Sequence, residues 1–529
     1  MSLKRDNTAM ENEHTAIGIE LGSTRIKAVM TDSSGTVIAS GSSSWENSLK
    51  DGVWTYGMDE VRDGLAKCFA SLKADYKAKT GAALTGTDAI GISAMMHGYI
   101  ALDGSDSLLV PFRTWRNTMT GEASEVLSDL MDFNIPQRWT IAHLGQAILR
   151  CEEHLKRLDK VFTLAAYVHY LLTGRRVIGI GDASGMFPID SLTKTWDEKA
   201  KAAFTKWAEA KGYDLSIDTL FPEVLTAGEN AGCLTEEGAL LLDPAGELKA
   251  GIPLVPPEGD AGTGMVATNS VRVGGGNVSA GTSDFAMVVV DHMPKRHREL
   301  DMVTTPSGEA VAMVHCNNCT SEINWWASIF RDFASKAGLE LDDGALYSLL
   351  YSVSLESDDD PAEYLSCNYH SGEGVTDFDR GVPMFIHMPS APPSLAAFMK
   401  CHMYSALATL KIGMDILKTE NITINRMLGH GGYFKSSDAG VRMLSAAIGA
   451  PVSVMETAAE GGAYGMALLA LYGASGKDKA LETWLDETIF STAEVRTVMA
   501  TEKEMRDADA YSASYRKLLS VERKALEVF

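Results

Sequence analysis

The sequence predicts an α/β protein built as two similar halves, and three observations support this class. Residues 16–40, "AIGIELGSTRIKAVMTDSSGTVIAS", alternate apolar and polar positions around a Gly-Ser-Thr turn, which is the pattern of a β-hairpin. The later segment "NVSAGTSDFAMVVVD" fits on this hairpin without a gap, with Gly281 on Gly22 and Asp291 on Asp32. Strand and helix patterns then alternate after each hairpin, as in α/β domains.

In the first half, "DAIGISAMMHGYIALD" predicts a pair of strands that meet at a tip. The following "LDKVFTLAAYVHYLLTG" predicts an apolar helix that ends at Gly174, because glycine is the usual residue after a helix C-terminus.

In the second half, "INRMLGHGGYF" predicts a strand that runs into a glycine turn. "DAGVRMLSAAIGAPV" has helical spacing and ends at Gly449 and Pro451, and "ETAAEGGAYGMALLALYG" predicts a helix of small residues. We interpret the remainder, from "ETWLDE" onward, as one charged closing helix.

The bulk composition limits the classes of partner. A chain of 529 residues with 45% apolar content is expected to fold as two large domains or several small ones. Its formal net charge of −23 would repel phosphate backbones and anionic lipid surfaces. We therefore expect neither nucleic acid nor a membrane as a partner.

Cysteine usage and the start of the chain predict a cytoplasmic protein. The seven cysteines show no framework spacing and are expected to be reduced thiols. Cys316 and Cys319 form a C-x-x-C pair, but a zinc site would require a second pair, which the sequence lacks. The first residues have no apolar segment typical of a secretory signal, and we expect residues 1–15 to be a disordered or vector-derived tail.

One acid, Asp260, lies among glycines in "VPPEGDAGTGM", just before the second half begins. Glycine and aspartate are ordinary residues of surface turns, so a turn is one interpretation. A catalytic acid is the other, because ligand sites are common at the boundary between domains.

The two Gly-Ser-Thr-type turns offer unhindered backbone N–H groups and short hydroxyls that can surround phosphate oxygens. Each could be an ordinary turn, but two facing each other across a cleft would hold a polyphosphate from both sides. The sequence has no Walker A loop, and no G-x-G-x-x-G follows the first strand, so these other nucleotide motifs are disfavoured.

The order of these motifs resembles the FGGY-type sugar kinases of the actin-like ATPase superfamily. The resemblance extends over "GIELGSTRIKAV", "SAMMHGYIALD", "GDASGMFPID", "PEGDAGTGM", "SAGTSDF", "NYHSGEGVTDFDRGVP" and "GHGGYFKS…EGGAYGMALLA", and it is greatest to xylulose kinases. It implies two actin-like (ribonuclease H-like) domains with an interdomain cleft, each a mixed sheet flanked by helices. The sugar-binding domain would span 16–265 and the nucleotide-binding domain 266–529.

The resemblance also implies site residues. Asp260 would be the catalytic base, and it would share Mg²⁺ with Glu20. The sugar would contact Asp260 and Met96, His97, Trp115, Arg116 and Asn117. The nucleotide ATP would contact Gly22, Ser23, Thr24, Lys27, Gly281, Thr282, Ser283, Gly431, Gly432, Lys435 and Gly462.

Two departures from the family pattern leave the sugar open. Glu20 replaces the usual Asp of the first turn, which keeps the charge and moves it by one methylene. In "PFRTWRNTMT", Trp115 is retained, but Asn117 stands in place of an Asp and Met119 in place of an Arg.

The predicted function is ATP-dependent phosphorylation of a small sugar, with a ketopentose such as D-xylulose or L-ribulose favoured. Gluconate, a deoxy-ketohexose and glycerol are alternative substrates. Other classes are an actin-like ATPase of the chaperone or filament type and a sugar-binding regulator without catalysis. The oligomeric state stays open, with a homodimer as one option.

Overall fold

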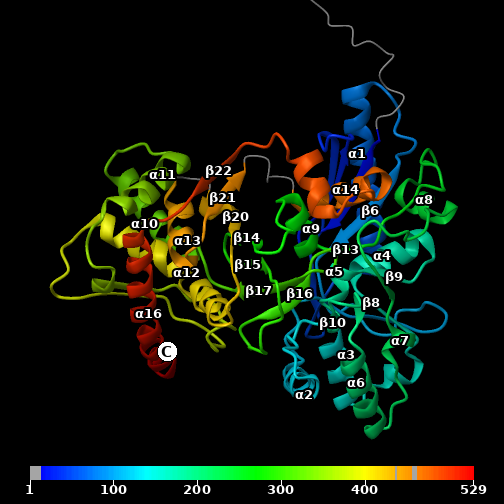
Figure 1. Ribbon diagram of the computed structural model, residues 1–529, viewed down its shortest axis with the longest axis horizontal. Coiled ribbons are helices and arrows are strands. Elements are labelled where there is room, and N and C mark those ends of the chain that lie inside the picture. Colours follow the sequence, from blue (N-terminus) through cyan, green and yellow to red (C-terminus); the bar gives the residue numbers. More distant parts are fainter. Residues whose placement is uncertain (1–13, 435–437, 456–460) are drawn as a thin grey trace, which may run out of the picture. The chain divides into compact units, whose positions relative to one another are not determined.

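The computed structural model describes residues 14–434, 438–455 and 461–529 (Figure 1). The predicted tail, 1–15, lies almost wholly outside these ranges. The described chain forms two compact units. The first unit comprises residues up to 271 with 303–310 and 459–492, and the second comprises 272–302, 311–458 and 493–529. The predicted domain division at 265 stays a prediction; the segment 459–492 belongs by its contacts to the first unit.

The core of the first unit is a five-stranded sheet with the order β13-β6-β1-β2-β3. Its strands are β1 (Ala16–Leu21), β2 (Arg25–Thr31), β3 (Val37–Ser44), β6 (Ala89–Ala94) and β13 (Glu258–Gly259). β1, β2 and β3 are antiparallel neighbours, whereas β1, β6 and β13 run parallel. The carboxyl ends of these three parallel strands therefore lie at one edge of the sheet.

Two helices cover opposite faces of this sheet, α1 (Met58–Thr80) and α14 (Gly461–Leu471). A Cβ on Gly18 would lie 2.2 Å from the Ala463 carbonyl oxygen of α14, and one on Gly41 would lie 2.3 Å from Leu72 N of α1. The register places Gly18 and Gly41 on opposite faces, because their partners Val29 and Ala28 are adjacent in β2. Glycines thus let both helix backbones approach the sheet closely.

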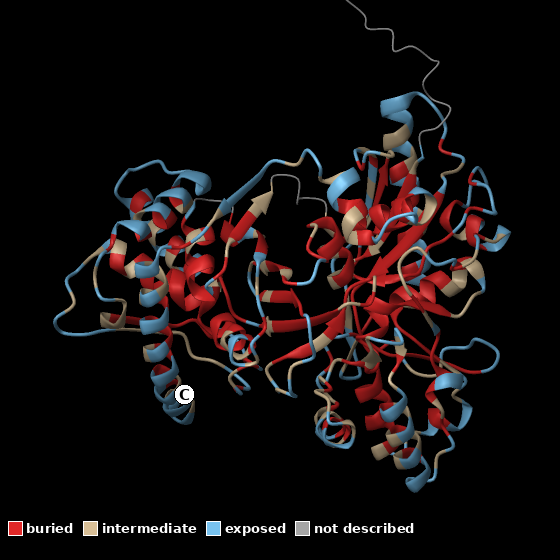
Figure 2. Cartoon of the chain, in the orientation of Figure 1, coloured by how far each residue is buried: buried red, intermediate tan, exposed pale blue. Residues whose placement is uncertain are grey.

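The core of the second unit is a seven-stranded sheet with the order β16-β17-β15-β14-β20-β21-β22. Its strands are β14 (Gly275–Ala280), β15 (Asp284–Val289), β16 (Asp301–Thr304), β17 (Ala310–Cys316), β20 (Arg426–His430), β21 (Val452–Met455) and β22 (Val495–Val498). The long helix α12 (Leu395–Thr419) is buried along most of its length (Figure 2). Its Gly413 packs on Val314 of β17.

The five-stranded sheet of the first unit and the five central strands of the seven-stranded sheet share one topology, which confirms the predicted repeat. β17-β15-β14-β20-β21 repeats the order and directions of β3-β2-β1-β6-β13. The gapless sequence alignment of the two hairpins does not match their strand pairing, however, because the two turns differ in length by one residue. Leu21 pairs with Ile26, but Ala280 pairs with Asp284, so that the second turn is one residue shorter.

The other strands form two-stranded sheets. These are β4 (Ser48–Lys50) with β5 (Val53–Thr55), β7 (Ile100–Leu102) with β8 (Lys160–Phe162), β9 (Val177–Gly179) with β12 (Glu223–Leu225), β10 (Ile189–Asp190) with β11 (Thr195–Trp196), and β18 (Tyr364–Cys367) with β19 (Met384–His387).

The remaining helices complete the layers around each sheet. The first unit contains α2 (Gly121–Met131), α3 (Thr140–Leu149), α4 (Leu164–Thr173), α5 (Ile180–Ala183), α6 (Glu198–Ala210), α7 (Ile217–Leu220), α8 (Glu236–Leu242), α9 (Asp260–Ala267) and α15 (Leu481–Trp484). The second contains α10 (Ser321–Lys336), α11 (Asp343–Val353), α13 (Asp438–Ile448) and α16 (Glu502–Val528). Within the described ranges, none of the helices is long and apolar enough to cross a membrane.

Three local predictions were wrong. The predicted pair in "DAIGISAMMHGYIALD" does not form, because β6 joins the central sheet while β7 pairs with β8. The stretch with Asp260 is the start of helix α9, so Gly262 and Gly264 lie in a helix and not in a turn. The closing segment is interrupted by β22, which pairs with β21 at the edge of the sheet.

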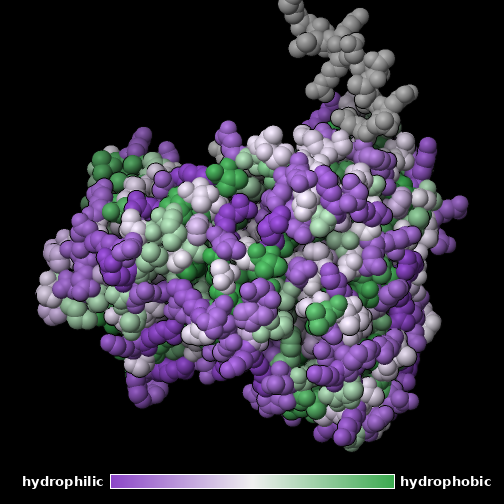
Figure 3. Space-filling model, viewed as in Figure 1, coloured by the Kyte–Doolittle hydropathy of each residue, from purple (hydrophilic) through white to green (hydrophobic). Residues whose placement is uncertain are grey.

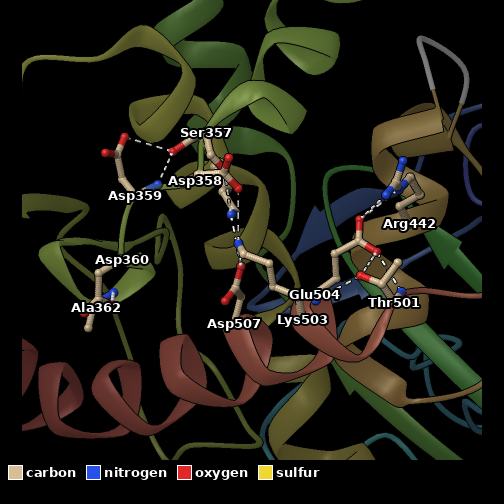
Figure 4. A network of polar contacts seen from close by, with 11 residues as sticks. Ser357, Asp358, Asp359, Asp360, Ala362, Arg442, Thr501, Lys503, Glu504 and Asp507 are labelled. Atoms are coloured by element: carbon tan, nitrogen blue, oxygen red, sulfur yellow. Dashed lines mark hydrogen bonds and ion pairs between the residues drawn. The ribbon is translucent and has the colours of Figure 1, made fainter.

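The closing helix α16 is fixed at its start by a network of polar contacts (Figure 4). Thr501 and Glu504 form a capping box, in which the Thr501 N–H donates to Glu504 Oε2 at 2.7 Å. Arg442 of α13 donates to Glu504 Oε1 at 2.8 Å, and Lys503 lies 3.1 Å from Asp507. The Arg442–Glu504 contact ties α16 to α13. On the face shown in Figure 3, hydrophilic side chains predominate, in keeping with the net charge of −23.

We predict that Gly465→Ala destabilises the protein by about 1–3 kcal/mol, the usual cost of overpacking. A Cβ at this position in α14 would lie 1.9 Å from the Thr263 carbonyl oxygen of α9, and backbone cannot move aside as a flexible side chain can. Gly264→Ala is the matched control, because a Cβ there meets open space. It should stabilise α9 by about 0.5–1 kcal/mol. Denaturant unfolding of both variants measures the difference, and equal effects would contradict the packing described.

Candidate active site

The site is built around two carboxylates of the first unit, Glu20 and Asp260. Glu20 is the penultimate residue of β1 and lies on the face covered by α14, where its Oε2 accepts the Ala463 N–H at 3.2 Å. Asp260 is the first residue of α9, directly after β13, and its Oδ1 accepts the Met96 N–H at 3.2 Å. Because β1, β6 and β13 are parallel, their carboxyl ends bring Glu20, Met96 and Asp260 together.

Burial raises the pKa of both acids above the ordinary carboxylate range. Burial raises the pKa of Asp260 to about 6, although the Met96 N–H opposes this shift. Burial, together with the charge of Asp260, raises the pKa of Glu20 to about 7, while Lys27 and the Ala463 N–H lower it. A base with a pKa near 6 is suited to accept a proton at physiological pH.

Small residues make room for Glu20. A Cβ on Gly462, at the start of α14, would lie 2.5 Å from Glu20 Oε1 and 2.9 Å from the Thr263 hydroxyl. Gly462 therefore lies beside the acid pair in the first unit. Gly431, with a φ of 103°, and Gly432 follow β20 in the second unit, as the predicted glycine turn requires. Lys435 lies outside the described residues.

Two further buried acids, Asp182 and Glu258, lie behind Asp260 and were not predicted as site residues. Glu258 Oε2 accepts the Asp182 N–H at 3.0 Å, and Asp182 Oδ2 accepts the Thr163 hydroxyl at 2.6 Å. Burial raises the pKa of Glu258 to about 8 and that of Asp182 to about 7. Burial therefore favours the neutral form of both carboxyl groups behind the base.

Glycines also explain why Glu258 can be buried. Cβ atoms on Gly179 and Gly181 would lie 2.4 Å and 2.3 Å from its carboxylate oxygens, so only glycine fits at both positions without movement. The sequence contains two glycine-containing runs that form this cradle, "GIGD" at 179–182 and "PPEGD" at 256–260. No spacing rule indicates that these two segments meet.

His97, a predicted sugar contact, is buried and lies in the left-handed region with a φ of 69°. Its Nδ1 lies 3.1 Å from the Gly185 carbonyl oxygen and its Nε2 accepts the Arg138 Nε–H at 3.1 Å. A carbonyl can only accept, so the proton of the neutral ring lies on Nδ1. These bonds fix the ring within the first unit, next to Met96.

The predicted sugar residues at 115–117 have different environments. Trp115 is 38% exposed, which leaves its ring accessible. The Arg116 guanidinium stacks over the Trp54 ring at 4.0 Å. Asn117 is buried, and its side chain binds both the N–H and the carbonyl of Trp54 at 2.9 Å. Asn117 therefore has a structural role in this structure, which no rule of sequence spacing could have revealed.

The first turn, Gly22-Ser23-Thr24, joins β1 to β2, and Ser23 and Thr24 are exposed. The Gly22 N–H donates to the Arg25 carbonyl at 3.0 Å, which closes the turn. Lys27 pairs with Glu20 in the β1–β2 register, so the two side chains lie on the same face.

The second turn, Gly281-Thr282-Ser283, has the same exposure pattern in the second unit. The Cys319 N–H donates to the Thr282 carbonyl at 2.9 Å, and the Thr320 N–H donates to the Gly281 carbonyl at 3.0 Å. Cys319 is thus part of the segment that holds this turn.

Buried polar groups in turn support the 317–320 segment. Glu373 Oε2 accepts the Asn317 N–H at 2.9 Å and the Asn318 side-chain amide at 3.1 Å. Cys316 and Cys319 are free, buried thiols, and burial raises the pKa of each. Across the part of the chain that the structure describes, no group of three or more His, Cys, Asp or Glu residues could hold a metal ion.

The fold and the site together define a two-domain kinase with the actin-like fold. Family models match both halves, the N-terminal domain of the FGGY family of carbohydrate kinases at residues 15–267 and its C-terminal domain at 276–474. The chain belongs to the FGGY family of carbohydrate kinases, and the resemblance found in the sequence is confirmed.

Individual relatives are distant. A xylulose kinase of Lactococcus lactis subsp. lactis is 22% identical over 86% of this chain and 87% of its own length. A gluconokinase of Bacillus licheniformis is 24% identical over 52% of each chain. The crystal structure of a ligand-bound xylulose kinase from Lactobacillus acidophilus superposes with a TM-score of 0.78 at 16% identity, over 96% of this chain and 98% of that one. These likenesses confirm the predicted fold and enzyme class, and leave the sugar open.

We predict that Glu258 contributes a decrease in the free energy of unfolding as the pH rises from about 4.5 to about 8, and that Glu258→Gln removes this contribution. The folded protein keeps the Glu258 proton up to a pH of about 8, whereas the unfolded chain releases it near its ordinary value of 4.5. Ionisation therefore favours the unfolded chain within this window. Denaturant unfolding at several pH values measures the slope. Exposed Glu125→Gln is the control, and equal slopes in wild type and Glu258→Gln would contradict the prediction.

Proposed function

We propose that the protein transfers the γ-phosphoryl group of ATP to a hydroxyl of a small ketopentose, D-xylulose or L-ribulose. The observation that carries this proposal is the Asp260 carboxylate, which is half-buried, oriented by the Met96 N–H and has a pKa of about 6. Xylulose kinases among the relatives support the choice of substrate class.

In the proposed reaction, Asp260 accepts the proton of the attacking sugar hydroxyl as phosphoryl transfer proceeds. Its place at the first position of α9 holds the carboxylate in one direction, and we assign Met96 and His97, which are almost completely buried next to it, to the sugar side of the site. The exposed Trp115 ring offers an apolar face to the sugar. The two hydroxyl-glycine turns supply N–H groups and hydroxyls for the phosphates of ATP.

Mg²⁺ fits the acid pair. The negative charge of Asp260 repels that of Glu20 and raises the Glu20 pKa. A divalent cation bound by both carboxylates would relieve that repulsion. Two protein carboxylates, completed by water and substrate phosphates, are the coordination that Mg²⁺ prefers. When bound, the ion would neutralise charge on the phosphates.

A coupled assay of ADP release tests the proposal across D-xylulose, L-ribulose, gluconate, a deoxy-ketohexose and glycerol. We expect the highest kcat/KM with a ketopentose. A highest value with gluconate would assign the chain to the function of its gluconokinase relative instead. Rapid hydrolysis of ATP that no sugar stimulates would favour an actin-like ATPase, and ligand binding without ADP release would favour a regulator.

We predict that Asp260→Asn lowers kcat by about 10²–10⁴-fold, the contribution of a positioned general base, while ATP still binds. The amide keeps the shape of the side chain but cannot accept the proton. Asp63→Asn, on the exposed face of α1, makes the same change of charge and should retain full turnover. If Asp260→Asn kept most of its kcat, Asp260 would not be the base.

We predict that Thr282→Val weakens ATP binding about threefold to tenfold, because it removes one exposed hydroxyl from the second turn while keeping the side chain's shape. Calorimetric titration with MgATP measures the loss, and the KM for the sugar should stay unchanged. Thr492→Val, at another exposed threonine, is the control. A change in sugar KM alone would place Thr282 elsewhere in the reaction.

A further inference from the structure

The first turn is held from behind through its carbonyl oxygens. The Trp45 indole Nε1–H donates to the Gly22 carbonyl at 2.7 Å, and the Tyr56 hydroxyl donates to the Ser23 carbonyl at 2.7 Å. The Trp45 backbone N–H donates to the Thr24 carbonyl at 3.2 Å. Three consecutive carbonyls of the turn are therefore engaged by two residues.

These two residues form one rigid unit. Trp45 directly follows β3 and Tyr56 directly follows β5, and both are almost completely buried. Their rings stack with centroids 4.2 Å apart at an interplanar angle of 27°. Aromatic side chains have few rotatable bonds, so that a stacked and buried pair holds its donors in fixed positions at low entropic cost.

Holding the carbonyls determines what the turn presents to a ligand. A carbonyl oxygen that faced a phosphate would repel it, whereas an N–H group attracts it. Among the residues that the structure describes, the N–H groups of Ser23 and Thr24 have no protein acceptor, and both residues are exposed. With the carbonyls bound on one side, these N–H groups are left for a ligand.

The second turn has the same design with different donors. Gly281 and Thr282 carbonyls accept from Thr320 and Cys319 backbone N–H groups, and the Thr320 hydroxyl adds a bond of 2.7 Å to the Gly281 carbonyl. The two turns thus share a constraint on their carbonyls, although only the first depends on aromatic side chains.

The aromatic pair also connects the first turn to a predicted sugar-binding residue. Arg116 donates to Asn47 Oδ1 at 3.1 Å, and the Asn47 side chain is in turn a hydrogen-bond partner of Tyr56. Burial raises the pKa of Tyr56, so its hydroxyl remains a donor over the physiological range. The contacts form a continuous path from Arg116 through Asn47 and Tyr56 to the turn.

We propose that Trp45 and Tyr56 are positioning residues for phosphoryl transfer, which hold the Gly22–Thr24 turn with its N–H groups toward the phosphates of ATP. This inference rests on the proposed function, in which that turn binds nucleotide. Neither residue touches substrate; each acts through the turn.

The first test is Tyr56→Phe, which removes the hydroxyl and keeps the stacked ring. We expect the KM for ATP and the Kd for MgADP to rise about threefold to tenfold, the effect of one hydrogen bond, while the KM for the sugar changes less than twofold. Tyr472→Phe is the matched control, because the hydroxyl of this buried tyrosine also donates to a backbone carbonyl, that of Lys479 at 2.8 Å.

The second test is Trp45→Phe, which removes the indole N–H and keeps an aromatic ring. Trp196→Phe is its control, since the buried Trp196 indole donates to the Pro222 carbonyl at 3.3 Å. The double variant, Trp45→Phe with Tyr56→Phe, should lose less than the product of the two single losses, because either change alone already lets the turn relax.

The outcomes separate a positioning role from a structural one. Weaker nucleotide binding in the two variants, at a Tm no lower than that of the controls, would support the proposal. Equal drops in Tm for variants and controls with unchanged MgADP binding would overturn it. Binding of MgADP does not require a sugar, so a wild-type protein that binds MgADP but phosphorylates none of the tested sugars would refute the proposed function alone.

Discussion

Parallel pairing of β1, β6 and β13 is the constraint on which the site depends. It brings Glu20, the Met96 N–H and Asp260 to one edge of the sheet, although they are far apart in sequence. The same edge excludes enough water to raise the pKa values of Glu20 and Asp260 toward neutrality. One topological feature therefore sets both the position of the proposed base and its readiness to accept a proton.

Glycine supports this arrangement by removing side chains where groups must approach closely. Gly462 leaves room for the Glu20 carboxylate, and Gly179 and Gly181 leave room for that of Glu258. Gly18 and Gly465 let α14 approach β1 and α9. Their common role is packing, since none of these five has a positive φ.

The two halves use one plan with different details. Each has an antiparallel hairpin, a hydroxyl-glycine turn and parallel strands on the far side of the first hairpin strand. In the first unit β1 and β13 bring Glu20 and Asp260 to their carboxyl ends, whereas in the second unit β20 is followed by Gly431 and Gly432. The shared topology accounts for two phosphate-type turns, and the differences account for a division between chemistry and nucleotide binding in the proposed function.

By itself, the sequence determined the α/β class, the two hairpins with their turns, the helix ends at Gly174 and Gly449, and the family, because these depend on local periodicity and short motifs. Only the tertiary structure decided that Asp260 begins a helix, that Asn117 binds Trp54, and that Asp182 and Glu258 lie behind the base. It also decided that Trp45 and Tyr56 hold the first turn. The physical reason is that hydrogen bonds and burial between segments distant in sequence leave no periodic pattern along the chain.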